Sequence, residues 1–391
     1  MKKTLSMLLA GAMLATALTG CGSSASTGSD SADNSTDSSA SGAAFKIGGT
    51  GPLTGANAIY GNACKNGAQI AVDEINAEGG DIQFELNYQD DEGDAEKAVN
   101  AYNTLKDWGM QLSLGSVTSK PCEATAAETY SDRIFALTPS ASSTATTEGK
   151  DNMFQMCFID PAQGTLAADK IAEKQLGTKI AIIWKNDDVY STGIHDNFVT
   201  EGKAKGLEVV SDMTFTDSSA NDFSVQLNDA KSKGAELVFL PIYYQPASLI
   251  LKQAHDMGFQ TTFFGVDGMD GILTLEGFDT SLAEGVLLMT PFSADDEKNA
   301  DFVNAYKDKY GDTPDQFAAD AYDGVHAVVE ALKEAGLGVD ADPTEVAEKL
   351  PEAMLKITVD GLTGKLSRND KGQVQKDPTA YVITDGKYVQ A

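Results

Sequence analysis

Two short loops rich in hydroxyl groups are the first place in this sequence where chemistry could occur. Residues 115–119 (GSVTS) and 139–143 (PSASS) each follow a strand-like apolar run, and Pro121 opens a helix directly after the first loop. Free backbone N–H groups and the dipole at such a helix start favour an anion. The chain has only two arginines, Arg133 and Arg368, so these loops, rather than an arginine clamp, would hold a carboxylate.

An acidic residue could supply the opposite half of the same site. Asp267 follows the strand-like run 262–265, and ligands of parallel α/β sheets bind at the carboxyl ends of the strands. An anion-binding loop that faces a carboxylate across a cleft describes a site for a zwitterion. The residue types therefore indicate an α-amino acid as the ligand. The tyrosines that follow predicted strands are Tyr60, Tyr190, Tyr243 and Tyr244.

Other kinds of chemistry find no support in the sequence. The histidines His195, His255 and His326 are far apart and in no metal-ligand spacing. Residues 49–54 (GTGPLT) lack the third glycine of a dinucleotide-binding fingerprint. The acidic run 90–94 is not part of a full calcium-binding loop, because the closing glutamate of such a loop is absent. No nucleophile–base pair or phosphate-binding motif is present. We therefore expect neither an enzyme nor a bound metal or cofactor.

The net charge of the chain argues against some classes of binding partner. It has 58 acidic and 29 basic residues, a formal net charge of -29. Binding of nucleic acid needs clustered lysine and arginine, so nucleic acid is not expected as a partner. The same charge disfavours adhesion of the folded part to an anionic bilayer.

The first 43 residues have the pattern of a secreted, anchored protein. Lys2 and Lys3 precede an apolar run at 5–18, which is too short to span a bilayer and is typical of a signal peptide over residues 1–20. The tetrapeptide that ends at Cys21 (LTGC) resembles the lipobox of bacterial lipoproteins, which implies cleavage before Cys21 and lipidation of its thiol. Residues 21–43 are almost all small or polar and predict a disordered tether.

Three cysteines remain beside Cys21, and an odd number allows at most one disulfide. They are Cys64, Cys122 and Cys157. A bridge between Cys64 and Cys122 and a set of three semi-buried thiols are both compatible with the sequence.

The rest of the chain alternates strand-like and helix-like segments. Apolar runs of strand length are followed by stretches with helical periodicity, most of which end at glycine. This alternation predicts an α/β fold with parallel sheets. About ten strands are too many for one open sheet, so two sheets, and hence two α/β lobes, are expected. The predicted strands are 45–50, 84–88, 112–114, 134–138, 154–158, 179–184, 207–215, 237–242, 262–265 and 286–289.

The chain from Phe45 onward resembles the branched-chain amino acid (Leu/Ile/Val) binding proteins of ABC importers, which have the type I periplasmic-binding-protein fold. Each motif alone is weak, but their order along nearly the whole mature chain is specific. The motifs are GPLTG (51–55) with Tyr60-Gly61, Asn66-Gly67, AVDEIN (71–76) with Gly79-Gly80, Asp90-Asp91, TPSAS (138–142), DPAQG (160–164), 187–193 and 265–268.

This resemblance implies two α/β lobes that close on a ligand and are joined by three crossings, near residues 157–160, 290–292 and 363–365. Lobe 1 would comprise 44–157 and 291–364, and lobe 2 would comprise 158–290 and 365–391. The implied ligand contacts are Ser116 for the carboxylate, Ser140 for backbone groups with Ala141 beside it, Ser142 for both ends of the zwitterion, Asp267 for the ammonium, and Tyr60, Tyr190 and Tyr243 or Tyr244 as an aromatic wall.

The implied function is that of an extracellular, monomeric lipoprotein that delivers an amino acid to an ABC permease in the cell membrane. A branched-chain or other apolar amino acid is expected. Two alternatives stay open at this stage. One is uptake of a small amide or urea-type ligand, and the other is a ligand-sensing receptor domain with the same fold.

Overall fold

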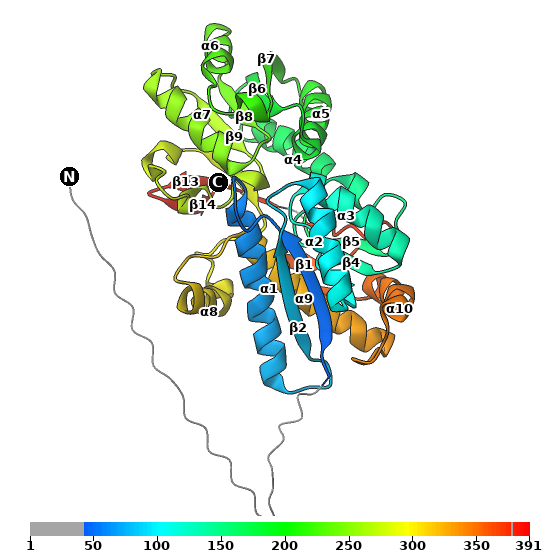
Figure 1. The fold of residues 1–391 in the computed structure, drawn as a ribbon. Coiled ribbons are helices and arrows are strands. Elements are labelled where there is room, and N and C mark those ends of the chain that lie inside the picture. The colour runs from blue at the N-terminus through cyan, green and yellow to red at the C-terminus, as the bar shows by residue number, and fades with distance from the viewer. Residues whose placement is uncertain (1–42, 377) are drawn as a thin grey trace, which may run out of the picture. The chain divides into compact units, whose positions relative to one another are not determined.

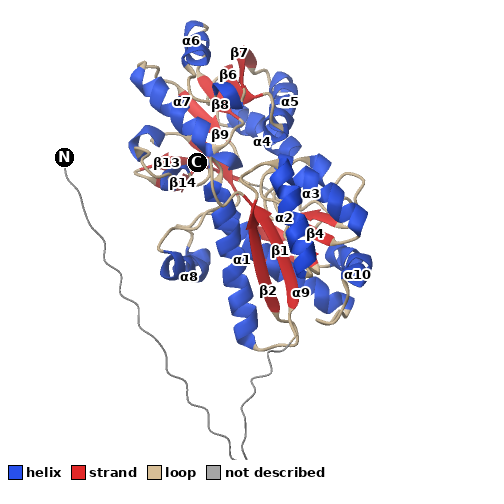
Figure 2. Ribbon diagram, viewed as in Figure 1, coloured by secondary structure: helices blue, strands red, loops and turns tan. Residues whose placement is uncertain are grey.

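The structure is a computed structural model that describes residues 43–376 and 378–391. Figure 1 shows the chain in order of sequence, and Figure 2 shows its helices and strands. The predicted signal peptide (1–20), Cys21 and all of the predicted tether (21–43) except residue 43 lie outside the described residues. What the sequence predicts for them therefore stays a prediction.

The first sheet has five strands, all parallel, in the order β2-β1-β3-β4-β5. Its interior strand β1, which lies between β2 and β3, is buried at six of its seven positions. Burial on both faces is typical of a parallel sheet that is covered by helices on both sides. The strands are β1 (Phe45–Gly51), β2 (Phe84–Asp90), β3 (Leu112–Ser113), β4 (Phe135–Thr138) and β5 (Met153–Gln155).

The second sheet has seven strands in the order β14-β13-β10-β9-β8-β6-β7. The five strands from β10 to β7 are parallel, and β13 and β14 add an antiparallel hairpin at one edge. The strands are β6 (Lys179–Lys185), β7 (Glu208–Phe215), β8 (Leu237–Leu240), β9 (Thr262–Gly265), β10 (Leu287–Thr290), β13 (Thr379–Thr384) and β14 (Lys387–Gln390); a separate pair is formed by β11 (Val359–Gly361) and β12 (Gly364–Leu366).

Ten α-helices in the described residues connect the strands and cover the sheets (Figure 2). Helix α1 packs against α9, α2 against α3, and α4 against α5. The helices are α1 (Ala58–Glu78), α2 (Ala95–Trp108), α3 (Ser119–Asp132), α4 (Asp160–Glu173), α5 (Val189–Ala204), α6 (Ser224–Ser232), α7 (Tyr244–Asp256), α8 (Ala300–Tyr310), α9 (Gln316–Ala335) and α10 (Pro343–Lys356).

The predicted α/β fold with two sheets is confirmed. We call lobe 1 the first sheet with α1–α3, α8–α10 and the pair β11–β12, and lobe 2 the second sheet with α4–α7. The last passage between the lobes lies later than the expected position at 363–365. Gln155 N donates to Gly372 O at 2.9 Å, and Arg368 pairs with Val374, so residues 364–374 lie against lobe 1.

The three remaining cysteines, Cys64, Cys122 and Cys157, are buried free thiols. Across residues 43–376 and 378–391, no group of histidine, cysteine, aspartate or glutamate side chains is arranged to hold a metal ion. No helix in the same ranges is both long enough and apolar enough to cross a membrane.

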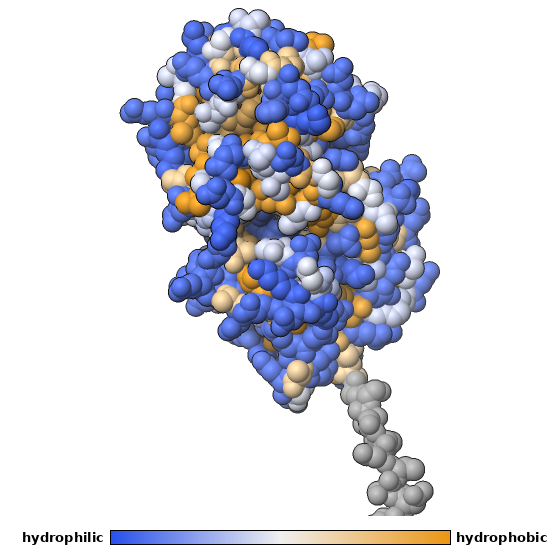
Figure 3. All heavy atoms as spheres, turned by 90° about the vertical axis from the view of Figure 1, so that its left-hand side faces the viewer, coloured by the Kyte–Doolittle hydropathy of each residue, from blue (hydrophilic) through white to orange (hydrophobic). Residues whose placement is uncertain are grey.

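On the face in Figure 3, hydrophilic residues predominate, as the high charge of the chain requires, and apolar residues gather mainly on the upper part.

Candidate functional site

Asp267 lies at the carboxyl end of β9, where the polypeptide leaves the second sheet in a short 3-10 turn, Asp267–Met269. Its side chain is 3% exposed. Tyr190 Oη donates to Asp267 Oδ1 at 2.6 Å, and the same hydroxyl accepts from Gly268 N at 3.0 Å. Asp188 caps helix α5 by accepting from Tyr190 N and Ser191 N, which fixes Tyr190 in the first turn. The helix cap therefore sets the geometry of the Tyr190–Asp267 pair.

The electrostatics of Asp267 suit a cationic partner. Burial is the main cause that raises the pKa of Asp267 to about 7, and the bonds from Tyr190 and Gly268 N–H oppose this rise. Burial also raises the pKa of nearby Asp160 well above its ordinary value. No lysine or arginine is paired with Asp267 among the described residues. A ligand ammonium would supply the missing positive charge and would favour the ionised carboxylate.

The hydroxyl groups of Thr118 and Ser142 face the site without a hydrogen-bond partner in the protein. Thr118 is the N-cap residue of α3, but its side chain makes no capping bond. Thr118 Oγ1 and Ser142 Oγ are both buried and unpartnered, although buried hydroxyls usually are bonded. The first N–H groups of a helix have no partner within the helix, and they favour an anion together with its dipole. These groups can bind a carboxylate.

Aromatic rings from both lobes enclose the space between these two ends. Tyr190 and Tyr243 of lobe 2 are stacked, with ring centroids 4.6 Å apart and planes within 7°. The ring centroid of Tyr60, in lobe 1, lies 5.6 Å from that of Tyr243 and 4.5 Å from that of Phe317. Tyr60 Oη also donates to Gly268 O, which joins the two lobes directly. The wall is thus apolar on its faces, and the hydroxyls of Tyr60 and Tyr190 are bonded to Gly268 and Asp267.

The structure brings most of the predicted site residues to one small cavity of about 10 Å³. That volume is about the space of a single water molecule, so an amino acid can enter only when the two lobes move apart. The predicted residues that line the cavity are Tyr60, Ser140, Ser142, Tyr190, Tyr243 and Asp267.

Three predicted residues do not line this cavity. Ser116 Oγ lies 2.6 Å from Thr50 Oγ1 and is turned toward it. Ala141 is fully buried in a small apolar cluster. Tyr244 Oη donates to Ala56 O at 2.7 Å, and only its backbone N–H reaches Tyr60 Oη. Direct ligand contacts by these three residues stay predictions.

Some lining residues were not among the predicted ones. Thr118 and Ser119 belong to the loop that the sequence singled out, so their position beside Pro121 at the helix start was a usable signal. Phe317 comes from the first turn of α9, far along the chain from every predicted site loop, and no local signal marks it. The lining residues that sequence reasoning missed are Val117, Thr118, Ser119, Gly268 and Phe317.

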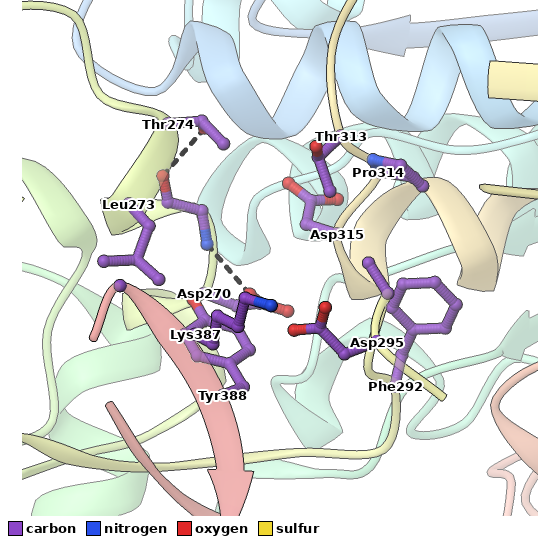
Figure 4. A pocket seen from close by; sticks show the side chains of 13 residues that line it. Asp270, Leu273, Thr274, Phe292, Asp295, Thr313, Pro314, Asp315, Lys387 and Tyr388 are labelled. Atoms are coloured by element: carbon purple, nitrogen blue, oxygen red, sulfur yellow. Dashed lines mark hydrogen bonds between the residues drawn. The ribbon is translucent and has the colours of Figure 1, made fainter. Parts of the chain in front are cut away.

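A second, larger cavity lies beside the site where lobe 1 meets the loop that follows Asp267. It has a volume of about 210 Å³ and includes Asp270, Asp295, Asp315, Lys387 and Tyr388 in its lining. Figure 4 shows the three carboxylates around this cavity. Burial raises the pKa of Asp270, and burial together with the charge of Asp270 raises the pKa of Asp315. Three carboxyl groups therefore line this cavity beside the loop that carries Asp267.

The two sheets, the closed cavity between them and its paired polar ends define a two-lobed ligand-binding protein. Residues 44–387 match the family model described as "Periplasmic binding protein", so the chain belongs to this family. The predicted type I periplasmic-binding-protein fold is thereby confirmed, as is the recognised resemblance to Leu/Ile/Val-binding proteins.

Similar proteins include both characterised relatives and solved structures. A leucine-, isoleucine-, valine-, threonine- and alanine-binding protein of Pseudomonas aeruginosa is 30% identical over 86% of this chain and 89% of the relative. A Leu/Ile/Val/Thr-binding protein of Salmonella typhimurium is also 30% identical, over 85% of this chain and 88% of the relative. The branched-chain amino acid transporter substrate binding protein LivJ of Streptococcus pneumoniae, solved in complex with isoleucine, superimposes with a TM-score of 0.80. It is 28% identical, and the match covers 89% of this chain and all of that one.

Proposed function

We propose that this protein captures an L-α-amino acid, branched-chain or otherwise apolar, and delivers it to an ABC permease. The observation that carries the proposal is the pairing of an unneutralised buried carboxylate, Asp267, with the unpartnered hydroxyls of Thr118 and Ser142 in one closed cavity. Such a site complements a zwitterion, and the apolar ring faces complement an aliphatic side chain. The ligands named for the relatives support the same class. The protein acts as a monomer and performs no chemistry on its ligand.

A thermal-shift screen with matched ligands tests this proposal. L-leucine carries both charges, leucinamide lacks the carboxylate, and 4-methylpentanoate lacks the ammonium. Only the complete amino acid should stabilise the protein strongly, by about 2.7 kcal/mol at 100 times its Kd. Equal stabilisation by leucinamide would favour an amide ligand instead. No shift with any L-amino acid would reject the proposed function.

The proposed location is the outer face of the cell membrane, with the lipidated thiol of Cys21 as the anchor. This rests on the lipobox-like LTGC sequence and the polar tether that follows it. Cys21→Ala should shift the protein from the membrane fraction to the soluble extracellular fraction, because the net negative charge of the chain disfavours adhesion of the folded part to an anionic surface. Cell fractionation with Cys64→Ala as the matched control measures this. Retention of the Cys21→Ala variant in the membrane would contradict the anchor.

A further inference from the structure

The loop 267–271, which carries Asp267, receives hydrogen bonds from lobe 1 as well as from its own lobe. Within lobe 2, Thr290 Oγ1 donates to Asp270 Oδ2 at 3.2 Å. From lobe 1, Gln316 Nε2 donates to Asp267 O at 3.1 Å, and Gln316 N donates to Asp270 Oδ2 at 3.0 Å. Gln316 is 1% exposed. One residue of lobe 1 thus bonds to both ends of the turn that presents the ammonium-binding carboxylate.

The start of helix α9 explains why Gln316 is free to make both bonds. Gln316 is the first residue of the helix, so its N–H has no partner within the helix. The N-cap residue Asp315 accepts from Ala318 N at 3.0 Å and leaves this N–H available. Asp270, from the other lobe, therefore places its carboxylate at the positive end of a 20-residue helix, which stabilises the negative charge.

The lobes are in close contact at the end of this loop. A Cβ added at Gly271 would lie 3.0 Å from Ile59 Cγ2 and 3.4 Å from Asp315 Oδ2, both in lobe 1, and Gly271 has a φ of +88°. Figure 4 shows Asp270 and Asp315 on the same cavity. The bonds from Gln316 therefore depend on the closed arrangement of the lobes, because they cross a contact that opening would separate.

We propose that Gln316 is a positioning residue that couples closure of the lobes to the placement of Asp267. When lobe 1 moves away, Asp267 O and the Asp270 carboxylate lose the donors that Gln316 supplies, and the loop is held by lobe 2 alone. Closure fixes the turn, and a ligand bound to Asp267 in turn favours closure, because such coupling is reciprocal. The identity of the group that Asp267 binds rests on the proposed function, but the coupling itself does not.

Hydrogen exchange tests the coupling without any ligand. Gln316→Met keeps the length of the side chain and removes its Nε2 donor to Asp267 O, whereas the backbone N–H that donates to Asp270 stays. Gln226→Met is the matched control, because Gln226 is similarly buried and donates to Thr214 O at 3.0 Å entirely within lobe 2. The amides of residues 268–271 should exchange about tenfold faster in Gln316→Met and at the wild-type rate in Gln226→Met. Unchanged exchange in Gln316→Met, or the same acceleration in both variants, would overturn the proposal.

Binding kinetics with L-leucine then test the consequence for the site. Gln316→Met should weaken binding about tenfold to a hundredfold, mostly through faster dissociation, whereas Gln226→Met should bind within about twofold of wild type. Wild-type affinity of Gln316→Met would reject the coupling. If the wild-type protein binds no L-amino acid, the proposed function fails, and the exchange result alone decides the coupling. Gln316→Asn, which keeps the amide but is too short to reach Asp267 O, replaces Gln316→Met if that variant does not fold.

Discussion

Asp267→Ala should weaken the binding of L-leucine by roughly two to three orders of magnitude. Asp267 is buried, and the hydrogen bond that its carboxylate accepts from Tyr190 Oη comes from a neutral donor. A ligand ammonium that enters the cavity without this carboxylate is a buried, unpaired charge. Removal of one partner of such a pair commonly costs about 3–5 kcal/mol of binding free energy. Converted to a dissociation constant, this cost corresponds to the expected loss of affinity. Isothermal titration calorimetry measures it directly.

Two further variants separate charge from hydrogen bonding. Asp267→Asn keeps the shape of the side chain and a partner for Tyr190 but removes the charge, so its loss should approach that of Asp267→Ala. Ser142→Ala removes one hydroxyl, which is unpartnered in the protein, and should cost about 1.5–3 kcal/mol, a smaller loss. Equal losses for Ser142→Ala and Asp267→Ala would indicate a neutral ligand. Full affinity in Asp267→Ala would reject both the residue and the amino acid as ligand class.

The sequence predicts the ten main strands because each is a short apolar run next to a helical pattern. Burial on both faces of a parallel sheet requires such runs, so the signal is strong. The C-terminal strands β11–β14 were missed because three of them have only three or four residues and all four are only partly buried. One usable signal was present: Asp385-Gly386 joins β13 and β14, both residues have positive φ, and this dipeptide is typical of a two-residue hairpin turn.

The candidate site was predictable in its parts but not in its assembly. Ser140, Ser142, Tyr190 and Asp267 follow strands, and the carboxyl ends of parallel strands meet at one edge of a sheet. The orientation of a side chain depends instead on its packing. Ser116 also follows a strand, yet its hydroxyl is bonded to Thr50, a contact 66 residues apart in sequence that no local pattern encodes.

The part that lobe 1 plays in fixing Asp267 was also beyond sequence reasoning. Gln316 and Phe317 lie at the start of α9, which packs on α1, and they reach the site only because the two lobes meet there. Their roles depend on the close approach of two separate sheets. A sequence pattern predicts mainly the helix or strand in which a residue lies. Contacts across the cleft are therefore the information that the structure adds.

The affinity for an amino acid should fall steeply as the pH falls below about 7. Burial raises the pKa of Asp267 to about 7 in the protein without ligand. The ligand ammonium stays protonated throughout this range, and it binds the ionised carboxylate, which lowers the pKa of Asp267 in the complex. Binding therefore releases a proton whenever Asp267 is protonated beforehand. The affinity of the protein for the amino acid therefore reaches its full value above pH 7 and decreases by up to about tenfold for each pH unit below it.

Titration calorimetry with L-leucine between pH 7.5 and pH 5 measures this dependence, and the expected loss of affinity is nearly two orders of magnitude, about 50- to 100-fold. Asp267→Asn is the matched control, because it cannot titrate, and its much weaker binding should change little over the same range. The control also accounts for every other ionisable group of the protein, because the variant differs from the wild type only at Asp267. If the wild-type affinity is flat from pH 7.5 to pH 5, the ammonium does not bind to an Asp267 whose pKa is raised, because proton and ligand would then not compete for the same carboxylate.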